Sequence, residues 1–151
     1  MKEFEYKINR FFQEFGDSKK MVLSTSFCDR VTSRMMSIVL IEDIFYFQTD
    51  ITFRKYEQIK NNSQVALCID NIQIEGICRE IGHPLKNEKF CAVYKKCFSG
   101  SYQAYSALEN ERLFAIKPLY IEVWEYKEGK PYIEIIDIEH KTYKCIKYES
   151  Q

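Results

Sequence analysis

Apolar and polar residues alternate in short runs along most of this chain, a pattern that is typical of antiparallel strands. The runs occupy residues 21–27, 32–41, 44–48, 64–69, 72–81, 112–126, 131–137 and 141–146. Brief turns join several of them, at Cys28-Asp29-Arg30, at Glu42-Asp43 and at Asp70-Asn71. The pattern therefore predicts a series of β-hairpins.

Helical spacing interrupts the strands in a few places. An amphipathic helix is expected near the N-terminus, ending at Gly16, with its apolar face made by Phe4, Ile8, Phe11, Phe12 and Phe15. A second helix is expected to begin after Thr49 or Asp50, either of which could cap it, and to end near Asn61-Asn62. Two short helices are expected at residues 86–98 and 101–108, separated by Ser99-Gly100.

Many short strands with a few helices indicate a mainly β protein, a closed antiparallel barrel with helical additions. A flat open sheet would expose edges that this sequence does little to protect. We find no repeat, low-complexity tract or linker, so a single domain is expected over residues 1–151.

The composition narrows the class of function. Lys and Arg balance Asp and Glu at 22 each, which argues against a dedicated nucleic-acid binder. No apolar stretch is long enough to cross a membrane, and the N-terminus lacks the apolar core of a signal peptide. The six cysteines form no CxxC pair, so reduced thiols and a cytoplasmic location are expected. With only five glycines and no glycine-rich loop, Rossmann and P-loop nucleotide sites are disfavoured.

Three cations give the strongest sign of chemistry. Arg54 and Lys55 fall in the first turn of the second predicted helix, where positive charge is unfavourable unless an anion accompanies it. Arg34 lies in mid-strand, followed by Met35, Met36 and Ser37. Helix N–H groups and nearby cations bind phosphate, and strand backbone with soft apolar side chains suits a flat ring. The alternatives are that Arg34 forms a surface salt bridge and that Arg54 and Lys55 point into water.

Other candidate residues are individually weaker. Thr49 and Thr52 could donate hydroxyl groups to the same phosphate. Gln73 either points into water from its strand or donates a hydrogen bond to the edge of a ligand ring. Trp124, the only tryptophan, is more often a core residue than a stacking platform. The histidines, His83 and His140, are too few and too scattered to suggest a metal site or a catalytic triad.

Taken in order, four segments resemble the pyridoxamine 5′-phosphate oxidase-like FMN-binding split barrels, and in particular their general-stress-protein branch. The segments are Arg34-Met35-Met36-Ser37, residues 45–50, Arg54-Lys55 and residues 71–76, and the resemblance extends over residues 21–124. It implies a six-stranded antiparallel Greek-key split barrel with flanking helices. It also implies a homodimer that binds FMN in the cleft between its subunits.

The resemblance assigns roles residue by residue. Arg34 and Lys55 would hold the FMN phosphate, with Arg54 as a helper. The isoalloxazine ring would be lined by Met35, Met36 and Ser37, partly through backbone atoms. The ribityl chain and phosphate would meet Gln48, Thr49 and Asp50. Gln73 would bond the ring edge, and Trp124 would reach the flavin from the other subunit.

The chain also departs from the oxidase proper. Val39 occupies the position of a lysine, Phe53 that of a serine, and residues 125–129 replace an Arg-x-His segment that grips the vitamin phosphate. These losses make pyridoxamine phosphate oxidation doubtful. The first hypothesis is therefore an FMN-dependent oxidoreductase that acts on an unidentified small molecule, with NAD(P)H as a plausible donor. The alternative is a non-catalytic flavin-binding stress-response protein. Haem or deazaflavin binding, and a purely structural dimer, are weaker options.

Overall fold

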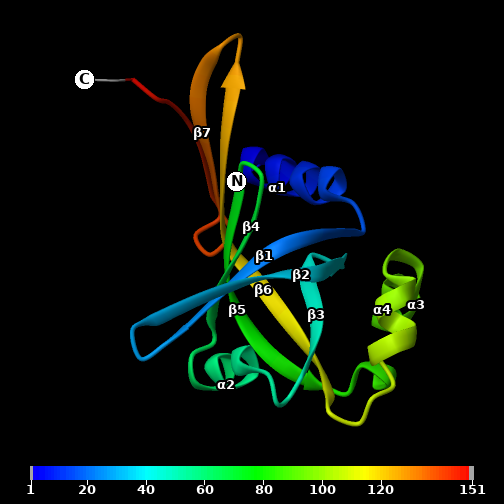
Figure 1. The fold of residues 1–151 in the computed structure, drawn as a ribbon. Helices are drawn as coiled ribbons and strands as arrows, with labels where there is room; N and C mark the ends of the chain where they lie inside the picture. The colour runs from blue at the N-terminus through cyan, green and yellow to red at the C-terminus, as the bar shows by residue number, and fades with distance from the viewer. Residues whose placement is uncertain (1, 150–151) are drawn as a thin grey trace.

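A computed structural model describes residues 2–149, which form a closed six-stranded antiparallel barrel with two further strands and four α-helices (Figure 1). The fold predicted from the sequence is thus confirmed. In chain order the elements are α1 (Lys2–Phe15), β1 (Ser18–Phe27), β2 (Arg30–Ile41), β3 (Ile44–Asp50), α2 (Arg54–Asn61), β4 (Gln64–Ile69), β5 (Ile72–Gly82), a 3₁₀ turn (Pro84–Lys86), α3 (Glu88–Cys97), α4 (Ser99–Tyr105), β6 (Glu111–Lys127), β7 (Lys130–Asp137) and β8 (Thr142–Lys147).

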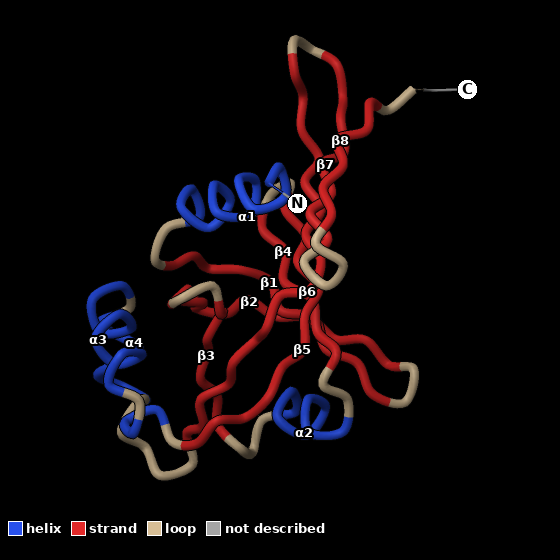
Figure 2. Tube along the Cα trace, turned by 180° about the vertical axis from the view of Figure 1, so that it is seen from behind, coloured by secondary structure: helices blue, strands red, loops and turns tan. Residues whose placement is uncertain are grey.

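The barrel closes because one strand has partners on both sides. The hydrogen-bonded order is β3-β2-β1-β4-β5-β6, and β6 returns to pair with β3. The far half of β6 and β7 form a hairpin that projects beyond the barrel, and β8 pairs along the other side of β7 (Figures 1 and 2). Closure leaves few strand edges unpaired. This agrees with the argument from the sequence, which favoured a barrel because an open sheet would expose unprotected edges.

The strand β6 changes partners at Pro118. Its residues 111–116 pair with β3, whereas residues 120–127 pair with β7. On the other side the register with β5 shifts between Glu75 and Gly76, with Gly76 opposite Pro118. A Cβ atom on Gly76 would lie only 2.6 Å from the carbonyl oxygen of Lys117. The absence of a side chain at Gly76 therefore allows the bulge at which the barrel branches.

The Gly76→Ala variant tests this branch point. Because the added methyl group meets backbone that cannot move without breaking the ladder, we expect about 2 kcal/mol of destabilisation, within the range of overpacked core sites. Urea unfolding measures the change. Gly100→Ala is the control, since a Cβ at Gly100 has no heavy atom within 4 Å. Equal stability of the two variants would contradict the steric account.

The core fills the barrel and continues under two helices. Phe45, Phe47 and Phe114 are fully buried at its centre. Phe15 of α1 packs edge-on against Phe45, with ring centroids 5.2 Å apart, and Phe4 and Ile8 join the same cluster. Ile59 of α2 belongs to the same cluster. Figures 1 and 2 show α2 at the opposite end of the barrel from α1. The helix α1 thus covers one end of the barrel with its apolar face.

A second apolar cluster lies outside the barrel, beneath α3 and α4. It contains Val39, Phe90, Tyr94 and Leu113. The break between these two helices falls at Phe98 and not at Ser99-Gly100, which form the first turn of α4. Phe98 leaves the helical conformation while its ring stays 5.5 Å from that of Tyr94, so the packing of an aromatic ring sets the break. No helix within residues 2–149 combines the length and apolar character needed to cross a membrane.

Candidate functional site

The barrel is split between β2 and β3. β2 pairs with β1 along residues 30–39, but its ladder with β3 covers only residues 39–41. Beyond that point β3 follows β6, with which residues 45–50 are paired. Within the described part of the chain, residues 30–38 of β2 therefore have no strand partner on the β3 side. The backbone N–H and C=O groups of this segment that point away from β1 can be used by a ligand.

The N-terminus of α2 lies after the end of β3. Its N-cap is Phe53, and no side chain caps the helix, so the prediction that Thr49 or Asp50 caps it was wrong. Asp50 instead stabilises the preceding turn, where its Oδ1 accepts hydrogen bonds from Thr52 N at 2.8 Å and from Thr52 Oγ1 at 2.7 Å. The first N–H groups of α2 therefore lack a side-chain acceptor, which is the state of a helix end suited to an anion.

The three predicted cations lie close enough to affect one another. Burial lowers the pKa of Arg34, and the charge of Arg54 lowers it further. Burial also lowers the pKa of Lys55, as does the charge of Arg34, while Glu111 and Asp50 oppose these effects. This arrangement concentrates positive charge at the uncapped end of α2.

Lys55 is the most unusual of the three. Its residue is only 9% exposed, and its Nζ lies 4.7 Å from the centre of the Phe53 ring. Among residues 2–149, Lys55 forms no ion pair. A buried amine without a partner is costly, and a bound anion would remove that cost.

Gln48 and Thr49 lie at the end of β3, both buried. The Gln48 Nε2 donates to Glu111 Oε1 at 3.0 Å, and its Oε1 accepts from Ser106 Oγ at 2.7 Å. Burial raises the pKa of Glu111. Glu111 and Ser106 were not predicted, because no local pattern marks two residues that meet Gln48 from 63 and 58 positions away. Thr49 Oγ1 is buried and has no hydrogen-bond partner among residues 2–149.

The side chains of Met35, Met36 and Ser37 on β2 point to different faces of the strand. Met35 is 61% exposed and points outward, whereas Met36 packs against the barrel core. Ser37 faces outward beneath α3 and lies beside the Tyr94 hydroxyl. Met36 can therefore meet a ring beside β2 only through its backbone.

Gln73 and Trp124 lie elsewhere on the barrel. Gln73 is exposed on the outer face of β5. Trp124 belongs to the β7 end of β6, where its ring packs edge-on against Tyr126 and Tyr148. At 36% exposed, Trp124 is not a core residue, so the commoner interpretation of a lone tryptophan was wrong. The structure does not bring either residue together with the cations within one chain.

The two substituted positions have different surroundings. Val39 is fully buried under α3, in the cluster with Phe90 and Tyr94. A lysine at this position would be enclosed by apolar groups without a partner for its charge, so Val39 is a core position in this chain. Phe53 is 55% exposed and lies against Lys55.

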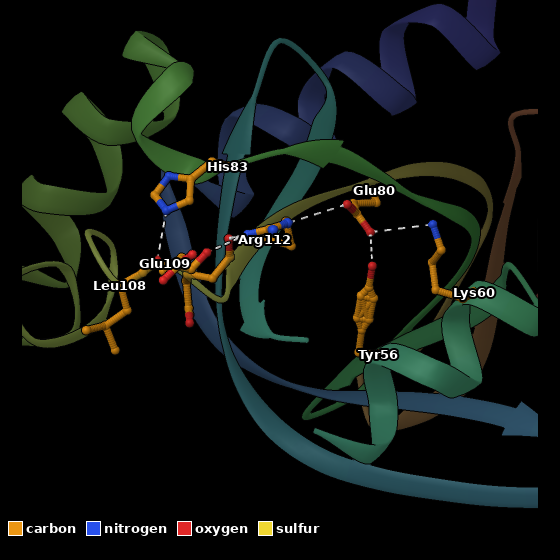
Figure 3. Close-up of polar contacts among 8 residues, drawn as sticks. Tyr56, Lys60, Glu80, His83, Leu108, Glu109 and Arg112 are labelled. Carbon is orange, nitrogen blue, oxygen red and sulfur yellow. Dashed lines mark hydrogen bonds and ion pairs between the residues drawn. The ribbon is translucent and has the colours of Figure 1, made fainter. Parts of the chain in front are cut away.

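A polar network attaches the other side of α2 to the barrel (Figure 3). The Tyr56 hydroxyl donates to Glu80 Oε1 at 2.5 Å. Lys60 and Arg112 form ion pairs with the same carboxylate, at 3.5 and 3.8 Å. The network therefore connects α2 with β5 and β6 and fixes the helix that carries Lys55.

His83 supports the neighbouring loop. Its Nε2 lies 2.8 Å from the Leu108 carbonyl oxygen (Figure 3), and its Nδ1 accepts from Leu85 N at 3.2 Å. Both ring nitrogens are engaged with the backbone, so this histidine has no free nitrogen to offer a haem iron.

Comparison with known proteins supports the fold. No protein-family model matches the chain, and no curated protein matches it in sequence. Among solved structures, general stress protein 26 from Bacillus anthracis is 24% identical, with a TM-score of 0.58 over 80% of this chain and 92% of its own. A heme storage protein from Vibrio cholerae is 18% identical, with a TM-score of 0.58 over 76% and 89%. A pyridoxamine 5′-phosphate oxidase-related, FMN-binding protein from Nostoc punctiforme is 13% identical, with a TM-score of 0.61 over 98% and 95%.

These similarities agree with the resemblance found in the sequence. The neighbours include the general stress and pyridoxamine 5′-phosphate oxidase-related proteins that the motifs indicated, and the chain shares their split-barrel fold. At such low identity the likeness establishes the fold alone. The ligand has to be argued from the site itself.

Proposed function

We propose that this protein binds FMN, with the phosphate at the N-terminus of α2. The observation that carries the proposal is the buried, unpaired Lys55, which lies close enough to Arg34 to be repelled by it beside an uncapped helix end. Phosphate is the anion that such a site suits, because it accepts several hydrogen bonds and carries the compensating charge. The unpartnered Thr49 hydroxyl and the open edge of β2 are further groups that a phosphate-bearing ligand could satisfy.

The remaining residues fit the rest of an FMN molecule. Arg34 and Lys55 would hold the phosphate, with Arg54 adding charge from the exposed side. Asp50 and the backbone at Thr49 lie where the ribityl chain would leave the phosphate, and Gln48 would position this segment through Ser106 and Glu111. The ring would lie along β2, against Met35 and the backbone of Met36 and Ser37. When bound, FMN supplies hydride and electron transfer, while the protein orients it and limits its contact with water.

The ring position is open on one side, which supports a homodimer. Met35 at 61% exposed and Val31 at 69% leave apolar surface on the outer face of β2. Gln73 and Trp124 are too far around the barrel to close this surface in the same chain. In the proposed dimer, Trp124 of the partner subunit covers the ring and Gln73 of the partner subunit meets its edge. Sedimentation equilibrium should then give twice the chain mass of 18.1 kDa.

An FMN-dependent oxidoreductase is the activity that we propose. Oxidation of pyridoxamine phosphate is disfavoured, because an apolar Val39 is buried under α3 and residues 125–129 carry neither the arginine nor the histidine that would grip a second phosphate. The substrate is a small molecule, and NAD(P)H is the first donor to test. A non-catalytic flavin-binding protein is the alternative. A yellow protein that oxidises NAD(P)H would support the enzyme, and a yellow protein inert toward donors would support the alternative.

Affinity measurements with two flavins test the binding proposal. FMN and riboflavin share the ring and ribityl chain and differ in the phosphate, so their affinity ratio isolates the phosphate contribution. We expect FMN to bind about 100-fold more tightly, equivalent to roughly 3 kcal/mol. Quenching of flavin fluorescence gives both dissociation constants. Equal affinities, or no binding of either flavin, would contradict the proposal.

The FMN-to-riboflavin affinity ratio should also depend on pH. The pKa of Lys55 is lowered from its ordinary 10.5, and a bound phosphate favours the charged amine and raises this pKa again. From about pH 7, where the phosphate is fully ionised, the ratio should stay constant as long as Lys55 of the free protein is charged. It should then fall as the pH rises through the lowered pKa of Lys55. Ionisation of the flavin ring affects both ligands and cancels.

Lys55→Arg is the matched variant for this experiment. An arginine stays charged throughout the range, so its affinity ratio should remain flat up to about pH 10. The same alkaline fall in both proteins would show that another group titrates.

A further inference from the structure

The guanidinium of Arg34 is held by a small polar network. Its Nη1 donates to the Leu23 carbonyl oxygen at 3.1 Å and to Thr25 Oγ1 at 2.9 Å. Its Nη2 donates to Thr32 Oγ1 at 2.5 Å. The amide oxygen of Gln58, on α2, lies 2.6 Å from each of the two threonine hydroxyls. Thr25 and Gln58 are both buried.

Gln58 determines the direction of these hydrogen bonds. A threonine hydroxyl has one hydrogen to donate, and both Thr25 and Thr32 donate theirs to Gln58 Oε1. Each hydroxyl must therefore accept from Arg34 and cannot donate elsewhere. An amide oxygen is only an acceptor, so with Gln58 Oε1 facing both hydroxyls their hydrogens point toward Gln58 and their lone pairs toward Arg34.

The network also leaves one edge of Arg34 available. A guanidinium has five N–H groups. The three bonds described use both hydrogens of Nη1 and one of Nη2. The Nε–H and the remaining Nη2–H lie parallel on one edge, and neither has an acceptor in the described part of the chain. Two parallel N–H groups are the fork with which arginine binds two oxygens of a phosphate.

We infer that Gln58, acting through Thr25 and Thr32, is a positioning residue that presents this fork of Arg34 to the phosphate of the ligand; the inference rests on the proposed FMN site. Gln58 lies on α2, three residues after Lys55, so one helix carries a phosphate-binding cation and orients the second cation on β2. Preorganisation of this kind lowers the cost of ordering a long side chain on binding.

The affinity ratio of FMN to riboflavin separates positioning from mere support of the fold. Loss of structure would weaken both flavins together and leave the ratio unchanged. Gln58→Met keeps the length of the side chain but removes the acceptor, and we expect the ratio to fall about tenfold. Thr32→Val, which removes one acceptor of Arg34, should lower the ratio similarly. Thr32→Ser keeps the hydroxyl and should stay within about twofold of the unmodified protein.

The outcomes are distinguishable. A lower ratio in Gln58→Met and Thr32→Val, with Thr32→Ser unchanged, would support the positioning role. If Gln58→Met does not fold, the Thr32 pair decides alone. An unchanged ratio in Thr32→Val would overturn the positioning role while the FMN proposal stands. Equal binding of FMN and riboflavin by the unmodified protein would overturn both.

Discussion

Replacing Arg34 and Lys55 together with methionine is expected to weaken FMN binding by about 100-fold to 1,000-fold, or roughly 3–4 kcal/mol. Both cations are proposed to contact the phosphate, and their removal leaves only the N–H groups of α2 and Arg54. Riboflavin affinity should change little, because riboflavin makes no phosphate contact. Calorimetric titration with each flavin measures the two effects.

A control variant separates the site from the net charge. Arg10→Met with Lys89→Met also removes one arginine and one lysine, from exposed ion pairs with Glu14 and Glu42. Such surface pairs contribute little to stability. This variant should bind FMN as the unmodified protein does. Equal weakening by the two double variants would indicate general charge attraction instead of a site.

The Phe114→Ala variant is expected to lose about 3–5 kcal/mol of folding stability, the usual cost of removing a fully buried phenylalanine. Phe114 is 0% exposed and packs edge-on against Phe47 at 5.2 Å and against Tyr56 at 5.7 Å. The cavity would thus open between the barrel core and Tyr56, which follows Lys55 on α2. Urea unfolding measures the loss, and Phe114→Leu should cost less because it refills part of the space.

The same variant tests whether the packing of α2 matters for the site. Tyr56 is attached to the barrel by Phe114 and by Glu80, so its loosening should also reduce FMN affinity. A Phe114→Ala protein with unchanged stability would contradict the assigned core. Unchanged FMN affinity at reduced stability would show that Phe114 does not help to hold α2 in place.

Local patterns in the sequence predicted most of the barrel. The β4 strand was predicted at residues 64–69, and β5 was predicted at residues 72–81, against the observed Ile72–Gly82. These features depend on side-chain period and turn residues, which are local. The break at Phe98 was misplaced because it depends on aromatic packing beneath the helix, which composition does not encode.

The candidate site was predicted less completely. Arg54 and Lys55 were singled out because positive charge in the first turn of a helix is unusual, and Arg34 because it lies in mid-strand before Met35, Met36 and Ser37. The cap at Thr49 or Asp50 was wrong, since Asp50 is engaged by Thr52. The contacts of Gln48 with Ser106 and Glu111, and of Gln58 with Thr25 and Thr32, join distant positions that only the closed barrel brings together.

A crystal structure of the protein grown with FMN tests the central claim most directly. We expect the flavin phosphate at the first turn of α2, within hydrogen-bond distance of the Arg34 fork and of Lys55 Nζ, with the ring along the unpaired edge of β2. A phosphate bound by other cations, or a ring that lies away from β2, would contradict the account.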